Sequence, residues 1–148
     1  MPIQQQHTPP TATAKATARR QVTWAAILQL IQGLLMEGLP FLALPVLMML
    51  QVDSQLLARG FSFIVPFFDD NLYLMMAMSG LFAMLRIIGA VGLLKNRMWG
   101  YALSFINCVV TLVLMLFMLP AGIADGLLSG TALILLLLAR YGKEPLLH

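Results

Sequence analysis

The chain has 148 residues, of which 60% are hydrophobic and 10% charged, with a net charge of +3. Soluble domains carry roughly 25% charged residues, so this composition indicates an integral membrane protein with several spans. No basic patch with interleaved aromatics suggests nucleic acid as a partner. Cys108 is the only cysteine, which excludes an intramolecular disulfide. Both histidines, His7 and His148, lie at the chain ends, so we expect neither a metal site nor a cofactor.

The first 21 residues are polar, rich in Pro, Thr and Ala, and basic at their end. Such a segment cannot bury a core, so residues 1–21 are predicted to form a flexible cytoplasmic tail. The apolar run that follows, 22–50, exceeds the about 7–15 residues of a signal-peptide core. It is therefore interpreted as a retained membrane anchor.

Four apolar segments follow one another along the chain, at about 22–50, 72–94, 98–119 and 121–141. Each supplies the roughly 20 residues that cross a bilayer, and within lipid such segments have to be helical. The sequence therefore predicts an all-α membrane protein, a bundle of four transmembrane helices spanning 22–141. An outer loop, 51–71, joins the first two helices, and 142–148 form a cytoplasmic C-terminus.

The distribution of Lys and Arg predicts the orientation. If the N-terminus is cytoplasmic, the basic residues on the inner side are Lys15, Arg19, Arg20, Lys95, Arg97, Arg140 and Lys143. Only Arg59 falls on the outer side. Basic residues concentrate on the cytoplasmic side of membrane proteins, so both termini are predicted to be cytoplasmic.

Polar residues inside the first two helices form the candidate site. Gln29, Gln32 and Glu37 lie in the first helix and Arg86 in the second. A charge at the bilayer centre costs about 2.5–3.5 kcal/mol and normally has a partner. At 1.5 Å per residue Glu37 lies about 20 Å, and Arg86 about 13 Å, from the inner surface. An extended arginine can cross that gap, so we predict an intramembrane ion pair.

Two interpretations of this pair remain open. It can fix the register of the helices, or it can form a proton or substrate site. The arginine favours the structural role, because it keeps Glu37 ionised whereas a proton carrier has to titrate. Pro40 and Pro45 follow Glu37, so the outer half of this helix is expected to kink or to end irregularly.

The outer loop contains an apolar, aromatic stretch, "FSFIVPFF" at 61–68. It can lie on the outer headgroups as an interfacial segment. Alternatively it forms a contact surface for a partner subunit, because exposed aromatic patches often mark interfaces. The partner surface would consist of Phe61, Phe63, Phe67 and Phe68.

Small and polar residues mark the faces on which the helices pack. In the second helix they are Ser79, Ala83, Gly89 and Ala90, and in the third Gly100, Ser104, Cys108 and Thr111, with Asn107 beside them. Small residues allow close helix approach, and Asn107 is expected to form an interhelical hydrogen bond. Gly122, Gly126 and Gly130 form a glycine ridge in the fourth helix, for packing either within the chain or against another chain.

The stretch "GLLKNRMWGYALS" (92–104) combines a Gly-Leu-Leu helix end, a basic turn and a Trp-Gly helix start. It resembles the second hairpin of many small bacterial four-helix inner-membrane proteins, which implies a bacterial cytoplasmic membrane. The small multidrug-resistance transporters are also similar in having four helices and a glutamate in the first. This chain differs from them in its long outer loop, its Arg86 and its strong Lys/Arg bias.

Catalytic motifs are absent, since there is no Ser/His/Asp set, HExxH or P-loop. The sequence therefore favours a noncatalytic protein that packs against other membrane subunits, or against itself, as an accessory, assembly or structural component. The alternative is a small transporter or ion-pathway protein that uses Glu37 and Arg86.

Overall fold

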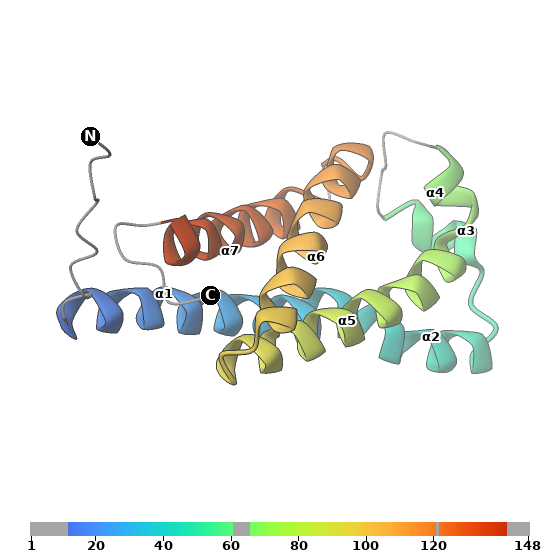
Figure 1. Ribbon diagram of the computed structural model, residues 1–148. Helices are drawn as coiled ribbons and strands as arrows, with labels where there is room; N and C mark the ends of the chain where they lie inside the picture. The colour runs from blue at the N-terminus through green and yellow to red at the C-terminus, as the bar shows by residue number, and fades with distance from the viewer. Residues whose placement is uncertain (1–11, 61–65, 121, 142–148) are drawn as a thin grey trace.

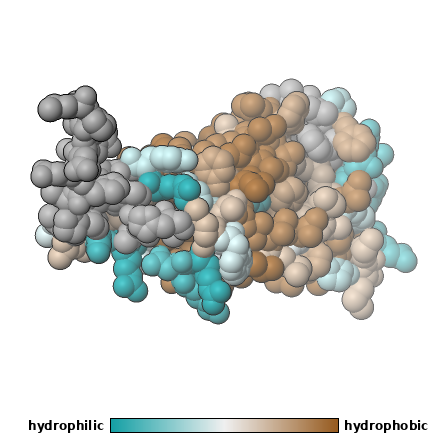
Figure 2. All heavy atoms as spheres, viewed as in Figure 1, coloured by the Kyte–Doolittle hydropathy of each residue, from teal (hydrophilic) through white to brown (hydrophobic). Residues whose placement is uncertain are grey.

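The computed structural model describes residues 12–60, 66–120 and 122–141, and every regular element within them is a helix. Four helical segments are long and apolar enough to cross a membrane: Lys15–Met49, Leu72–Leu94, Met98–Phe117 and Ile123–Tyr141. The predicted all-α fold with four spanning helices is thereby confirmed. The face shown in Figure 2 agrees with this, because hydrophobic residues dominate its middle and hydrophilic ones lie toward both ends.

The first span is one long rod built from three elements: α1 Ala12–Ile31, the π-helical η1 Gln32–Gly38 and α2 Leu39–Met49 (Figure 1). It begins ten residues before the predicted start at Val22. The prediction of a flexible tail is therefore wrong for residues 12–21 and lies outside the described residues for 1–11. Alanine is the best helix former, and the burial of Ala18 ties this extension to the fold.

The predicted irregularity appears just before the first proline. Pro40 has no N–H to offer the carbonyl four residues earlier, and its ring crowds that turn. A wider π-turn relieves this conflict. A Cβ on Gly38 would lie 3.0 Å from the carbonyl oxygen of Gly33, so glycine suits this turn. Pro45 lies inside α2.

The remaining spans are α5 Leu72–Leu94, α6 Met98–Phe117 and α7 Ile123–Tyr141. The bounds of α5 agree with the prediction, whereas α6 ends two residues before 119 and α7 begins two residues after 121. The outer connection contains two short helices, α3 Ser54–Ala58 and α4 Pro66–Asp70, instead of an uninterrupted loop. Asp53 caps α3 by accepting a hydrogen bond from the Gln55 amide at 2.9 Å.

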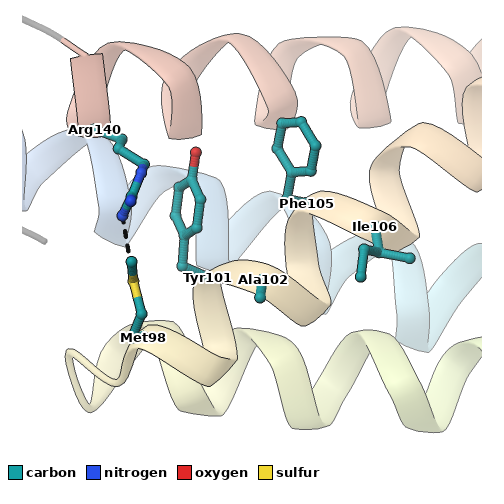
Figure 3. A pocket seen from close by; sticks show the side chains of 6 residues that line it. All are labelled: Met98, Tyr101, Ala102, Phe105, Ile106 and Arg140. Carbon is teal, nitrogen blue, oxygen red and sulfur yellow. Dashed lines mark hydrogen bonds between the residues drawn. The ribbon is translucent and has the colours of Figure 1, made fainter. Parts of the chain in front are cut away.

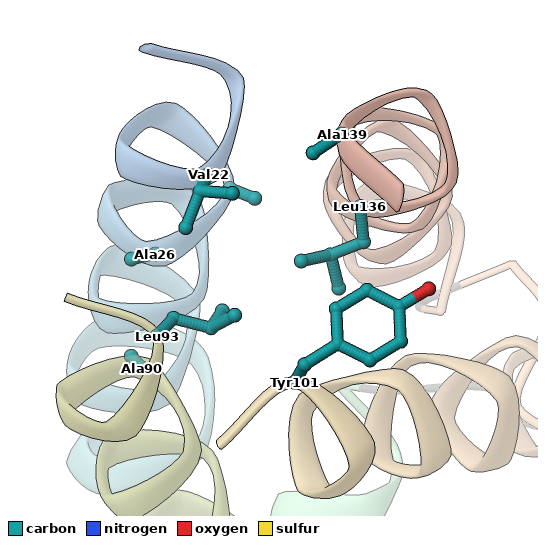
Figure 4. Close-up of a cluster of buried hydrophobic side chains, with 8 residues drawn as sticks. Val22, Ala26, Ala90, Leu93, Tyr101, Leu136 and Ala139 are labelled. Carbon is teal, nitrogen blue, oxygen red and sulfur yellow. The ribbon is translucent and has the colours of Figure 1, made fainter. Parts of the chain in front are cut away.

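The four spans form a ring in which α1 packs against α5 and α7, and α6 packs against α5 and α7 (Figure 1). Their common core combines small and large apolar side chains from every span (Figure 4). Its members are Val22, Ala25, Ala26, Ala90, Leu93, Tyr101, Leu136 and Ala139. This core lies at the end of the bundle that carries the turn between α5 and α6.

The predicted small-residue faces pack inside the chain. A Cβ on Gly92 would lie 2.6 Å from the Cα of Gly100, and one on Gly89 would lie 2.7 Å from Ser104 Oγ, so α5 and α6 cross in close contact. Gly122 and Gly126 both face Met115 of α6. The glycine ridge is therefore used within the chain, where the sequence had left its partner open.

The bundle is thinner at the end that carries α3 and α4 than at the end that carries the turn between α5 and α6. α2 packs against α5, and none of its residues is buried. A small second cluster forms where Leu72 and Met76 of α5 meet Leu44 and Leu47 of α2 and Leu57 of α3. The molecule thus has a four-helix level and a second level formed mainly by α2, the end of α5 at Leu72 and the short helices.

Candidate functional site

Glu37 and Arg86 meet in the interior of the bundle, as the sequence predicts. Arg86 is 0% exposed and Glu37 7% exposed. Arg86 Nη2 donates to Glu37 Oε1 at 2.6 Å, and Arg86 Nε donates to Glu37 Oε2 at 3.1 Å. This two-bond geometry is the strongest form of a carboxylate–guanidinium pair. The arginine packs closely against Gly33, where a Cβ would lie at van der Waals contact, 3.4 Å from Arg86 Cδ.

The π-turn brings Glu37 into this position. In a regular α-helix, residues five apart point about 140° away from each other. A π-turn closes on a residue five positions away, which places such residues on nearly the same face. Gln32 and Glu37 are the first and sixth residues of η1, and both are buried. The irregular turn therefore directs two polar side chains of the first span toward the same interior region.

The ion pair belongs to a hydrogen-bond network that joins all four spans. Arg86 Nη2 also donates to Thr111 Oγ1 of α6 at 2.6 Å, and Arg86 Nη1 donates to Ser129 Oγ of α7 at 3.3 Å. Gln32 Nε2 donates to Ser129 Oγ at 2.8 Å and to the Asp125 carbonyl oxygen at 3.0 Å. The Asp125 carboxylate also accepts from Gln32 Nε2. Arg86, Glu37 and Gln32 thus each have a hydrogen-bond partner on a neighbouring helix.

Two predicted polar residues lie outside this network. Gln29 Nε2 donates to Cys108 Sγ at 3.3 Å, and no hydrogen bond joins Gln29 to the ion pair among the described residues. The prediction that Asn107 forms an interhelical hydrogen bond is wrong for its amide nitrogen, because this atom is buried and has no partner among the described residues. Asn107 and Cys108 instead occupy buried positions on the packing face of α6.

Sequence reasoning missed two members of the network. Neither Ser129 nor Asp125 was identified from the sequence as a partner of the polar residues in the first span. Residues four apart share one face of a helix, and Asp125 and Ser129 have this spacing. Their common face was therefore a usable signal. What the sequence lacked was the π-turn that aims Gln32 at them.

A cavity of about 720 Å³ lies beside this network, between α2, α5 and α6. Its polar lining consists of Glu37, Ser79, Thr111 and Asp125. Most of the rest is apolar, and six of the lining side chains are methionines: Met36, Met75, Met76, Met78, Met115 and Met118. Ser79 Oγ donates to the backbone carbonyl of Glu37 at 2.9 Å, which ties the cavity wall of α5 to η1.

A smaller cavity of about 330 Å³ lies near the other end of the bundle (Figure 3). Tyr101, Phe105 and Ile106 of α6 line it, together with Arg140 of α7. The Arg140 guanidinium lies 5.3 Å from the centroid of the Tyr101 ring, and its Nη1 donates to Met98 Sδ at 3.3 Å. This pocket is an aromatic, one-sided groove around a single arginine and contains none of the predicted site residues.

Most of the predicted aromatic partner surface cannot be placed. Phe61 and Phe63 lie outside the described residues, and so does the side chain of Phe68. Phe67 is 58% exposed in α4 and contributes to the lining of the 720 Å³ cavity. The described part of this stretch therefore lies over the outer end of that cavity.

No group of three or more His, Cys, Asp or Glu side chains suited to a metal ion occurs among the described residues. Comparison of the chain with protein-family models, with curated proteins and with solved structures finds no match. The arrangement offers a fully partnered ion pair, one further acid and an adjoining apolar cavity.

Proposed function

We propose that this chain is a noncatalytic, multi-pass protein of a bacterial cytoplasmic membrane, with both termini inside. It acts by helix packing as an accessory, assembly or structural subunit of a larger membrane complex. The ion-pair network supports a structural role for the charges, because every span contributes a partner to it. Removing one partner of such a pair leaves a buried charge alone, so the network favours one register of the four helices.

The observation that supports this proposal is a row of exposed apolar side chains on the first span. Five of its exposed apolar side chains recur at steps of four, three, four and three residues: Leu35 of η1, and Leu39, Leu42, Val46 and Met49 of α2. Their exposed fractions run from 55% to 85%. Such spacing is that of a helix that pairs with another helix through interlocking side chains. We name these five residues the α2 stripe, and infer that a transmembrane helix of another chain packs against it.

Gentle extraction followed by native mass analysis tests this proposal. The wild-type protein should appear in a stoichiometric complex with other membrane chains. The double substitution Leu42→Ala and Val46→Ala should release it, because it removes two adjacent side chains of the α2 stripe. The matched control is Val109→Ala with Val113→Ala, which truncates two lipid-exposed side chains of α6 at the same spacing. A wild-type monomer, or equal behaviour of the two variants, would contradict the proposal.

A second candidate function is a small transporter or ion-pathway protein. The observation in its favour is that the 720 Å³ cavity reaches Glu37 and Asp125. Solute flux into proteoliposomes is the appropriate measurement, with a homo-oligomer rather than a mixed complex as the expected assembly. The completed ion pair supports the first candidate more strongly, because Glu37 has a fixed partner in Arg86.

A further inference from the structure

We propose that the groove of about 330 Å³ between α6 and α7 binds one anionic phospholipid, with the lipid phosphate on Arg140 and the start of an acyl chain along Phe105 and Ile106. The site lies on other helices than the α2 stripe, so it goes beyond the accessory role and does not depend on it. It also contains neither Glu37 nor Asp125, which concern the transporter candidate. Loss of lipid binding, loss of a partner complex and loss of transport are therefore separate results.

Arg140 has only neutral partners among the described residues. Its Nη1 donates to Met98 Sδ at 3.3 Å, and a thioether sulfur is a weak acceptor. Its guanidinium lies 5.3 Å from the ring centroid of Tyr101 and 5.8 Å from that of Tyr141. The one ion pair in the described part of the chain lies in the network, at Arg86. A guanidinium offers five N–H donors in a planar fork that matches a phosphate group, so a phosphate here would add strong hydrogen bonds to these weak contacts.

The charges at this end of the bundle favour an anionic lipid over a zwitterionic one. Lys95 and Arg97 are exposed in the turn between α5 and α6, and the next residue, Met98, contacts Arg140. The described acids all lie elsewhere, in the ion-pair network or in the connection between α2 and α5. Clusters of Lys and Arg beside a membrane attract anionic headgroups. A lipid with a net negative charge is therefore attracted by the whole region, whereas the ammonium of a choline headgroup would meet further cations.

The apolar part of the groove favours a lipid over free phosphate. Trp99 and Tyr141 are exposed at this end, and such aromatic residues collect at the membrane–water interface, which places Arg140 at the level of the headgroups. Figure 3 shows Phe105 and Ile106 farther along α6 from Arg140. At 1.5 Å per residue, Ile106 lies about 10 Å farther into the membrane than Trp99. The walls of the groove therefore change from a cation at headgroup level to hydrocarbon at the level of the acyl chains.

Native mass spectrometry of the full chain in detergent tests lipid binding, with phosphatidylglycerol and phosphatidylcholine of identical acyl chains as probes. We expect one phosphatidylglycerol molecule to bind at a concentration on the order of tenfold below that of phosphatidylcholine, because the basic residues attract its net charge. Glycerol phosphate in large excess is the competitor without acyl chains, and it should not displace the lipid. Equal binding of the two lipids, or displacement by glycerol phosphate, would overturn the proposal.

Two pairs of variants locate the site within the chain. Arg140→Gln should weaken phosphatidylglycerol binding on the order of tenfold, because it removes the charged donors. Its matched control is Arg97→Gln, which changes an exposed arginine at the same end that does not line the groove and should alter binding little. Ala102→Trp fills the groove at an exposed lining position and should weaken binding, whereas Val109→Trp, at an exposed position of α6 outside the groove, should not. Equal effects within either pair would overturn the assignment. Melting temperatures confirm that each variant is folded.

Discussion

Arg86 connects the helices of the bundle through hydrogen bonds in an interior where its own side chain is fully buried. Its guanidinium donates to Glu37, Thr111 and Ser129, which come from three other parts of the chain. Taking two charges out of water is favourable only when the geometry is good and the remaining donors have partners. Both conditions hold here. The charge pair was predictable from depth and sign, whereas Thr111 and Ser129 as its additional partners were not, because many small polar residues share these helix faces.

The first prediction concerns this pair and takes the form of a double-mutant cycle. Glu37→Gln and Arg86→Met should each lower the free energy of unfolding by about 3–5 kcal/mol, because each leaves one charge buried alone. The double variant should lose clearly less than the sum of the two. Thermal stability in detergent measures all three. Strictly additive losses would mean that the two charges act independently, contrary to the contacts in the structure.

At the scale of elements, glycine positions determine how closely the helices approach. Gly92 and Gly100 face each other across α5 and α6, so closely that a Cβ on Gly100 would overlap the backbone of Gly92. The sequence predicted close packing from such spacing. It could not predict which glycines meet backbone and which have space, because that depends on the crossing angle. The π-turn is a similar case, since Pro40 predicts irregularity but not the seven residues over which it spreads.

The second prediction compares two glycine-to-alanine changes. Gly100→Ala should destabilise the protein by about 1–3 kcal/mol, because the methyl group meets backbone that cannot turn away. Gly130→Ala is the matched control: its Cβ would meet Leu112 Cδ2 at an ordinary 3.8 Å. Alanine is the better helix former by up to about 1 kcal/mol, so this variant should be neutral or more stable. Melting temperatures in one detergent measure the stability of both variants, and equal losses would contradict the close packing of Gly100 against Gly92.

At the scale of the whole molecule, the four spans differ in length and this shapes the cavity. The first span runs over 35 residues and α7 over only 19. Asp125, at the start of α7, bonds to Gln32, so α2 continues beyond the level at which α7 begins. The number of spans and their approximate ends followed from hydropathy alone, except for the start of the first helix. The two-level shape did not, because it depends on which residues of unequal helices align, and polar side chains determine that alignment here.

The last prediction concerns the orientation, which rests on the Lys/Arg distribution. Lys95 and Arg97 are exposed in the turn between α5 and α6, and Arg59 lies in the outer connection. Because basic residues concentrate on the cytoplasmic side, a cysteine at Asn96 should be protected in intact cells from a membrane-impermeant thiol reagent. A cysteine at Ser54, in the outer connection, should react.

The native Cys108 is buried and is replaced by alanine in both variants, so that any labelling reports the introduced thiol. Asn96→Cys should react once the cells are opened, which controls for an unreactive site. The reverse pattern in intact cells would place both termini outside, and with them the four-helix level of the bundle, its core and Arg140.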